Sequence, residues 1–347
     1  HENIYTIKDT IREDIQIMKK TRNILIGIVL FVLSLSLGSV IINPLTTSEI
    51  LINSLFGHSL FKENWNPNLQ IIVINIRLFR VLFAFLVGAS LSLAGDITQK
   101  VTKNPLMDPY ILGVSSTVVF ANILLLILNV ENLIIIIIFS VFMSMITLSI
   151  ILLVSKKVGQ RKNIVMILIG FSVSTAISSI NSILLYVKTE GAEFKSFVFW
   201  AMGSLEIYNL ELLVAILVVF LVSLAFIIIL NKEYELISMG EKFSTNTGVD
   251  YHRYSNYFLI ISVILTAVVV SVCGTIGFIG IIVPNIVKML NIKNKLATML
   301  VWGGILLVVA DLVSRMILPP LELPVGIITS LLGGAFFIYY MVVKNYD

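Results

Sequence analysis

The stretch "NIRLFRVLFAFLVGASLSLAGD" (residues 75–96) places two arginines, Arg77 and Arg80, about one helical turn apart in front of an uncharged apolar run. The run ends at Asp96. A helix that crosses a bilayer needs roughly 20 predominantly apolar residues, and this stretch is close to that length. It predicts a membrane-spanning helix with basic residues at one end.

The composition of the whole chain excludes an ordinary soluble domain. The chain has 347 residues, of which 58% are hydrophobic and only 13% are charged, whereas a soluble chain carries about 25% charged residues. Apolar runs long enough to cross a bilayer recur from end to end. We therefore predict an all-α, polytopic membrane protein with about ten transmembrane helices. The predicted crossings are 24–42, 78–98, 111–129, 133–155, 164–187, 210–230, 256–273, 276–290, 296–314 and 324–343.

The basic residues indicate how these crossings are oriented. With both termini in the cytoplasm, 18 of the 24 Lys and Arg residues fall in cytoplasmic segments. This asymmetry follows the positive-inside rule and supports an even number of crossings. Arg77, Arg80 and Arg315 then lie at helix ends on the outer face. There they either reach lipid headgroups, which charge alone favours, or bind a partner.

Two polar regions flank or interrupt the apolar runs. Residues 1–22 carry isoleucines at steps of three and four between charged residues, which predicts an amphipathic helix on the cytoplasmic membrane surface. Residues 23–347 form the predicted transmembrane domain. Within it, residues 231–255 form a polar internal loop that is punctuated by Gly240 and Gly248.

One charge-free run is too long for a single crossing. It extends for 34 residues between Arg253 and Lys288, about 51 Å as a helix. The stretch "GTIG" (274–277) is the predicted break, which leaves the second crossing of the pair short. The wider stretch "GTIGFIG" (274–280) follows no predicted strand, so packing of helices through small residues explains it better than dinucleotide binding.

The sequence lacks the motifs of several functional classes. No P-loop pattern occurs, so the chain does not hydrolyse nucleotides by that route. The single cysteine, Cys273, and three scattered histidines provide neither a disulfide framework nor a metal cluster. No paired nucleophile and base is present, which makes a membrane-embedded enzyme the least favoured class. The basic residues gather on one membrane face, which argues against a nucleic-acid partner.

The predicted crossing 164–187 carries hydroxyl groups on one face. Ser172, Thr175, Ser179 and Ser182 recur at steps of three and four residues, which aligns them along a helix. Such a face either lines a wet cavity or allows close approach of another helix. The residues alone leave both interpretations open.

The longest motif-bearing stretch is "RLFRVLFAFLVGASLSLAGDITQKVTKNPLMDPYILGVSS" (77–116). Four later stretches are "FWAMGSL" (199–205), "GTIGFIGIIVPNIVK" (274–288), "ADLVSR" (310–315) and "LELPVGIITSLLGG" (321–334). Together and in this order they resemble the FecCD family of ABC importer permeases, which serve ferric siderophores, haem and cobalamin. The resemblance covers essentially the whole chain after the first 22 residues.

The resemblance implies a type II ABC importer permease in a bacterial cell membrane. Such a permease pairs with a second one, identical or paralogous, and with two cytoplasmic ATPase subunits. The ATPase subunits hold ATP and magnesium, so this chain itself is expected to bind no cofactor. An extracytoplasmic substrate-binding protein, or lipoprotein, would deliver an iron–siderophore complex. Haem and cobalamin are the alternative substrates within the family.

The resemblance also implies roles for individual residues. The arginines of the outer face would dock the binding protein, two stretches would close the cytoplasmic gate, the internal loop would couple to the ATPase, and the hydroxyl face would line the pathway. The docking residues are Arg77, Arg80 and Arg315, and the gate residues are Asn104, Leu106, Asn163 and Ile164. The coupling residues are Gly240, Glu241, Ser244 and Gly248, and the pathway residues are Ser172, Thr175, Ser179 and Ser182.

The sequence departs from the family pattern at a few positions. Phe79 stands where the family has a proline, and Asn285 and Lys288 replace a common histidine and arginine. The rival from another class is an ion-coupled secondary transporter, which would need no ATPase and would depend on intramembrane carboxylates. Asp96 and Asp311 are the candidates for that role.

Overall fold

A computed structural model describes residues 27–57, 60–157, 162–188, 192–206, 209–290 and 295–344. The amphipathic helix predicted for residues 1–22 lies outside them. The described chain is nearly all helical and contains no β-strand, only an isolated bridge between Leu318 and Leu321. The predicted all-α class is confirmed.

The chain divides into two compact units. The first comprises residues up to Val81 together with Arg315–Glu322, and the second comprises Leu82–Ser314 and the residues from Leu323 onward. Helix α4 begins in the first unit and continues in the second, whereas α14 begins in the second unit and ends in the first.

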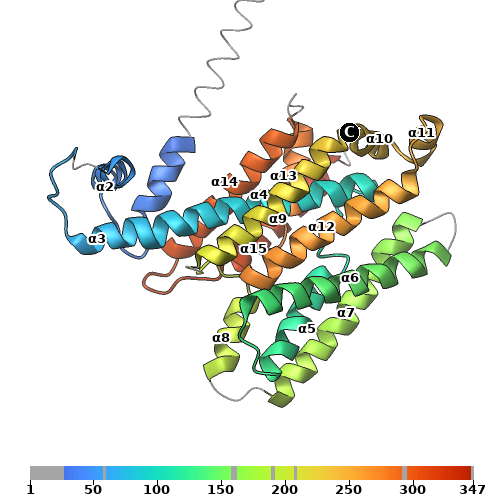
Figure 1. The fold of residues 1–347 in the computed structure, drawn as a ribbon, viewed down its shortest axis with the longest axis horizontal. Coiled ribbons are helices and arrows are strands. Elements are labelled where there is room, and N and C mark those ends of the chain that lie inside the picture. Colours follow the sequence, from blue (N-terminus) through green and yellow to red (C-terminus); the bar gives the residue numbers. More distant parts are fainter. Residues whose placement is uncertain are drawn as a thin grey trace, which may run out of the picture. The chain divides into compact units, whose positions relative to one another are not determined.

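The first unit consists of short helices that precede α4 (Figure 1). After the helix Gly27–Ser36, α2 begins at a typical capping signal, because the Asn43 side chain accepts a hydrogen bond from the Leu45 amide and proline occupies the first helical position. Gly57 ends α2 in the left-handed conformation. The remaining helices of this unit are α2 (Pro44–Phe56), α3 (Pro67–Ile71) and the π-helix η1 (Ile72–Leu78).

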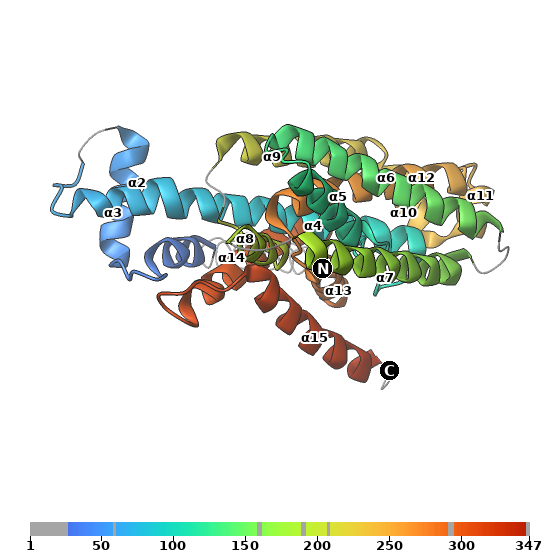
Figure 2. The ribbon, with the colours of Figure 1, turned by 90° about the horizontal axis from the view of Figure 1, so that it is seen from below.

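The second unit contains the long helices. Helices α5, α6 and α7 pack side by side in both views, and α12 contacts α5, α6 and α9 (Figures 1 and 2). The helices of this unit are α4 (Phe79–Thr102), α5 (Val114–Ile127), α6 (Leu133–Lys157), α7 (Lys162–Lys188), α8 (Ala192–Ala201), α9 (Leu210–Ile229), α10 (Asn231–Met239), α11 (Glu241–Asn246), α12 (Tyr251–Cys273), α13 (Ile279–Met289), α14 (Lys295–Met316) and α15 (Val325–Lys344).

Each of the ten predicted crossings overlaps a helix in the described residues, and seven helices there are long and apolar enough to span a bilayer. Three are shorter, with 10 to 17 residues, so their crossings stay predictions. These are Gly27–Ser36, Val114–Ile127 and Ile279–Met289.

The long charge-free run divides where the glycines predicted it. Helix α12 ends at Cys273, and Gly274 follows with a φ of 69°. Helix α13 begins only at Ile279, after Phe278, which also has a φ of 69°. The break leaves α13 with 11 residues, the short member of the pair.

The helices extend beyond the predicted crossings in two respects. The helix predicted to begin at 78 extends back through η1 and α3 to Pro67, because Asn66 caps it and residues 69–76 are mostly apolar. Helices α2 and α8 occupy segments for which the sequence predicted no crossing. Hydropathy windows suited to 20-residue spans pass over helices of 10 and 13 residues.

Glycines allow α4 to approach α13 and α14 closely. A Cβ atom on Gly88 would collide with the backbone of Gly303 in α14, and one on Gly95 would collide with the backbone of Gly280 in α13. Two glycines seven residues apart thus form one face of α4, as is common where membrane helices pack through small residues. Gly280 belongs to the stretch "GTIGFIG", whose predicted role in helix packing agrees with this contact.

Substituting Gly95 tests this crossing. We expect Gly95→Ala to destabilise the chain by about 1–3 kcal/mol, because the added methyl group forces α4 and α13 apart. Thermal unfolding of the detergent-solubilised chain measures the loss. Gly334→Ala in α15 is the matched control, since a Cβ there meets no atom within 4 Å. Equal unfolding midpoints for the two variants would contradict the close crossing.

Candidate functional site

Two of the three arginines that were predicted to dock a partner, Arg77 and Arg315, donate hydrogen bonds to the end of a helix. The helix Gly27–Ser36 leaves its last carbonyl groups without helical partners. Arg77 in η1 donates hydrogen bonds to the carbonyl oxygens of Leu35 at 2.8 Å, Ser36 at 2.9 Å, and Val40. A cation at a helix C-terminus also complements the helix dipole.

Arg315 reaches the same helix end from the other end of the chain. Its guanidinium donates to the carbonyl oxygen of Ser34 at 3.2 Å and lies 3.5 Å from that of Leu37. Gly38 leaves room for both side chains, because a Cβ there would lie 3.1 Å from the Arg77 guanidinium and 3.6 Å from that of Arg315. Arg77 and Arg315, which are 238 positions apart in sequence, therefore converge on one set of backbone carbonyls.

The third arginine forms an ion pair within the same unit. Arg80 Nη1 lies 2.6 Å from Glu322 Oε2, which ties the start of α4 to the segment Arg315–Glu322. The Arg80 side chain is only 5% exposed and that of Glu322 is 22% exposed. Glu322 is thus the more exposed residue of this ion pair.

The three arginines are buried, with exposed fractions of 4% for Arg77, 4% for Arg80 and 2% for Arg315. The sequence predicted that they reach lipid headgroups or a partner, and in the structure their side chains instead contact groups of the same chain. Apolar surroundings favour a charge that is hydrogen-bonded internally. The backbone carbonyls that accept from Arg77 and Arg315 carry no sequence signal, and the partner of Arg80 is a distant carboxylate. Docking of a partner through them stays a prediction.

A second polar cluster joins the internal loop to α4. Tyr234 of α10 donates a hydrogen bond of 2.7 Å to Asp96 Oδ2, and both residues are buried. Lys100 lies 3.4 Å from the same oxygen, 2.9 Å from Glu235 Oε1, and 4.0 Å from the centre of the Tyr234 ring. Burial, followed by the adjacent Asp96 carboxylate, raises the pKa of Tyr234 well above its usual value. The phenol therefore stays protonated and donates to the carboxylate.

The predicted coupling residues form the turn between α10 and α11. Gly240 has a φ of 114° and lies against the Lys103 side chain, where a Cβ would collide with it. The buried Ser244 hydroxyl donates to the carbonyl groups of Leu236 and Gly240 at 2.8 Å each. Glu241 is exposed beside His252, and Gly248 has a φ of 83°. These residues shape two short helices on the loop.

The predicted gate residues lie in different surroundings. Asn104 and Leu106 are half-buried neighbours, because the Asn104 side chain accepts a hydrogen bond of 3.0 Å from the Leu106 amide. Ile164 is 58% exposed in the first turn of α7, while the Asn163 side chain lies outside the described part. Nothing in the described residues brings the two stretches together, and their gating role stays a prediction.

The hydroxyl face of α7 is exposed along its length. Ser172, Thr175, Ser179 and Ser182 are all exposed, and each hydroxyl donates to the carbonyl four residues earlier. The neighbouring face packs instead against α5, where Asn181 donates to the Ser116 carbonyl at 3.0 Å. Packing among the described residues therefore occupies one face of α7 and leaves the hydroxyl face uncovered by them.

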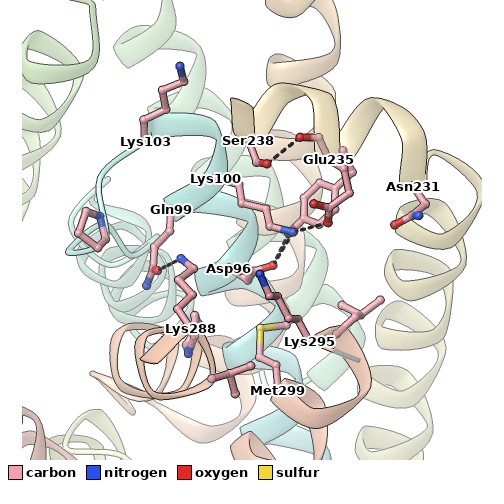
Figure 3. Close-up of a pocket in the computed structure, with 15 residues that line it drawn as sticks. Asp96, Gln99, Lys100, Lys103, Asn231, Glu235, Ser238, Lys288, Lys295 and Met299 are labelled. Carbon is pink, nitrogen blue, oxygen red and sulfur yellow. Dashed lines mark hydrogen bonds and ion pairs between the residues drawn. The ribbon is translucent and has the colours of Figure 1, made fainter. Parts of the chain in front are cut away.

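A pocket of about 440 Å³ opens beside the Asp96 cluster. Its polar lining includes Lys100, Lys288 and Lys295 from α4, α13 and α14 (Figure 3). Sequence reasoning counted these lysines as cytoplasmic charges but did not bring them together. The only available signal was their position at predicted helix ends, which does not reveal which helices are neighbours.

The FecCD transport family matches residues 25–343 of the chain. The molybdate import system permease protein MolB of Haemophilus influenzae is 32% identical over 78% of this chain and 81% of its own length. A Helicobacter pylori permease protein named for iron chelatin transport is 31% identical over 93% of this chain and 98% of its own.

A solved structure is similar in fold over nearly its whole length. It is an inward-facing conformation of a metal-chelate type ABC transporter, with a TM-score of 0.72 and 29% identity. The match covers 86% of this chain and 97% of the solved one.

We expect the Tyr234–Asp96 hydrogen bond to stabilise the packing of α10 against α4. A hydrogen bond to a charged group contributes about 1.5–3 kcal/mol. We expect Tyr234→Phe to speed amide exchange in α10 by about tenfold or more, because local opening becomes easier. Hydrogen–deuterium exchange followed by mass spectrometry measures this.

Tyr254→Phe in α12 is the matched control, since Tyr254 contacts Tyr257 through its ring. We expect α10 to exchange at the wild-type rate in that variant. Unchanged α10 exchange in Tyr234→Phe would show that the hydrogen bond does not hold the helix.

Proposed function

The chain belongs to the FecCD transport family, and on that premise we propose that it moves an iron–siderophore complex into the cell as the permease of an ATP-driven importer. The observation that carries the assignment to an ABC importer permease is the family match over residues 25–343. Seven bilayer-length helices among the described residues agree with it. Permeases of this family transport substrates and are not themselves catalytic.

The iron complex is the finer part of the proposal. The similarity to an iron chelatin permease and to a metal-chelate type transporter supports it. The similarity to a molybdate permease makes molybdate a further candidate, and haem and cobalamin remain the alternatives within the family. An ion-coupled secondary transporter would differ from all of these because it would work without an ATPase.

The proposed assembly follows from the family. We propose that the chain pairs with a second permease and two ATPase subunits in a bacterial cell membrane, with both termini in the cytoplasm. A binding protein or lipoprotein would deliver the substrate on the outside. The uncovered hydroxyl face of α7 supports a pathway or a partner permease beside that helix, because no part of the described chain packs there.

The coupling proposal rests on the contact between α10 and α4. Gly240, Glu241, Ser244 and Gly248 shape the turn that would sit on the ATPase. The buried hydrogen bond between Tyr234 and Asp96 would then carry a movement of this loop into a spanning helix. Lys100 adds a charged link between the same two elements.

Uptake in a strain that lacks this permease tests the proposed substrate. Labelled iron would be offered as several siderophore complexes, with labelled haem, cobalamin and molybdate alongside. We expect re-expression of the chain to restore uptake of at least one iron–siderophore complex and of none of the other three. Uptake of haem, cobalamin or molybdate alone would refute the iron proposal, and restoration without any ATPase partner would refute the importer class.

Docking through Arg80 has a separate test, because Glu322 competes for the same guanidinium. Arg80→Gln and Glu322→Gln both remove the ion pair and are expected to lower stability alike. If Arg80 meets an acidic group on the binding protein, Arg80→Gln weakens that affinity by about tenfold while Glu322→Gln leaves it unchanged or tighter.

Surface plasmon resonance of the binding protein on the reconstituted importer measures both affinities. Lys62→Gln, at an exposed lysine of the same unit, controls for loss of one positive charge. Equal affinities for the Arg80 and Glu322 variants would assign Arg80 a purely structural role.

A further inference from the structure

The pocket beside Asp96 lies between the ends of three apolar helices and the internal loop. Its walls come from α4, α10, α13 and α14, and its volume is about 440 Å³. Figure 3 shows Lys100, Lys288 and Lys295 around the opening, whereas the Lys103 side chain points away from it. None of the roles described above uses this space.

The charges that line the pocket do not balance. Four lysines and two carboxylates, Asp96 and Glu235, are among its fifteen lining residues. Lys100 contacts both carboxylates, which leaves them engaged with the nearest ammonium group. The pocket therefore carries a net positive charge that comes from the other lysines.

Two of those lysines, Lys288 and Lys295, form no ion pair with a carboxylate in the described part of the chain. Lys288 donates a hydrogen bond of 2.8 Å to Gln99 Oε1, a neutral acceptor. It also lies within electrostatic range of Asp96, Lys100 and Lys295. Lys288 and Lys295 are both exposed, so an anion from outside can reach them. An anion between them would relieve the repulsion of like charges.

One side of the lining is apolar. Pro284, Val287, Leu296 and Met299 come from α13 and α14 and lie beside the lysines. Lysines provide point charges that suit a phosphate group, and a basic pocket between membrane helices suits the headgroup of an anionic phospholipid. An apolar wall next to the charges suits the start of an acyl chain.

We propose that this pocket binds a phosphate group through Lys288 and Lys295, with its apolar wall contacting the remainder of the molecule. The phosphate can come from an anionic phospholipid or from a soluble phosphate compound. The chemistry at the lysines is the same in both cases.

Titration of the detergent-solubilised full chain tests the proposal. The probes are phosphatidylglycerol, zwitterionic phosphatidylcholine and pyrophosphate, and native mass spectrometry counts the bound molecules. We expect one equivalent of phosphatidylglycerol to bind, and Lys288→Gln/Lys295→Gln to weaken it about thirtyfold, since each basic residue near a membrane surface contributes a similar share.

Two variants separate specific binding from general charge. Lys288→Arg/Lys295→Arg keeps the charges and is expected to retain binding within about threefold. Lys156→Gln/Lys157→Gln removes two exposed lysines at the end of α6 and is expected to leave binding unchanged. Equal weakening by this control and by the pocket variant would overturn the proposal.

The probes also identify the source of the phosphate. Binding of phosphatidylglycerol that pyrophosphate does not displace supports a lipid, and displacement by pyrophosphate supports a soluble compound. Absence of binding by both would overturn the proposal. If the double variant fails to fold, the single Lys295→Gln at the exposed start of α14 is expected to weaken binding about fivefold.

Discussion

Charges that are buried among apolar helices must be satisfied by groups of the same chain, and this constraint organises both units of the structure. An uncompensated charge in an apolar environment costs several kcal/mol or more. Arg77 and Arg315 meet it by donating to carbonyl groups at the end of the helix Gly27–Ser36. Asp96 meets it by accepting from Tyr234 and pairing with Lys100. Apart from the Asp96–Lys100 pair within α4, each of these contacts ties together segments that are far apart in the sequence.

Close packing of α4 against α13 and α14 fixes the position of Asp96. Gly88 and Gly95 let its backbone approach α14 and α13, which fixes where the end of α4 lies within the second unit. Asp96 follows Gly95 directly, so the residue that holds α10 is placed by the same crossing. Packing through small residues and the polar contact therefore reinforce each other, and a change at one is felt at the other.

Hydropathy and the order of motifs predicted the helical class, the long helices and the break at "GTIG", because those features depend on local composition. The same reasoning missed α2 and α8, since helices shorter than a bilayer have no hydropathy signal of their own. It also did not predict which groups Arg77, Arg80 and Arg315 contact within the chain. Their partners are mainly backbone carbonyls, which every residue type supplies, and a carboxylate 242 positions away in sequence. The sequence also did not predict the convergence of Lys100, Lys288 and Lys295, because that convergence depends on which helices are neighbours.

The hydroxyl face of α7 has a chemical character that its residue types alone do not convey. Each hydroxyl proton of Ser172, Thr175, Ser179 and Ser182 is already committed to a carbonyl one turn earlier. The face therefore presents oxygen lone pairs and aliphatic carbon to its surroundings, with few free donors. A wall of that kind wets readily but holds a hydrogen-bond acceptor weakly. If the helix borders the route of the substrate, as proposed, an oxygen-rich complex would slide along it instead of adhering.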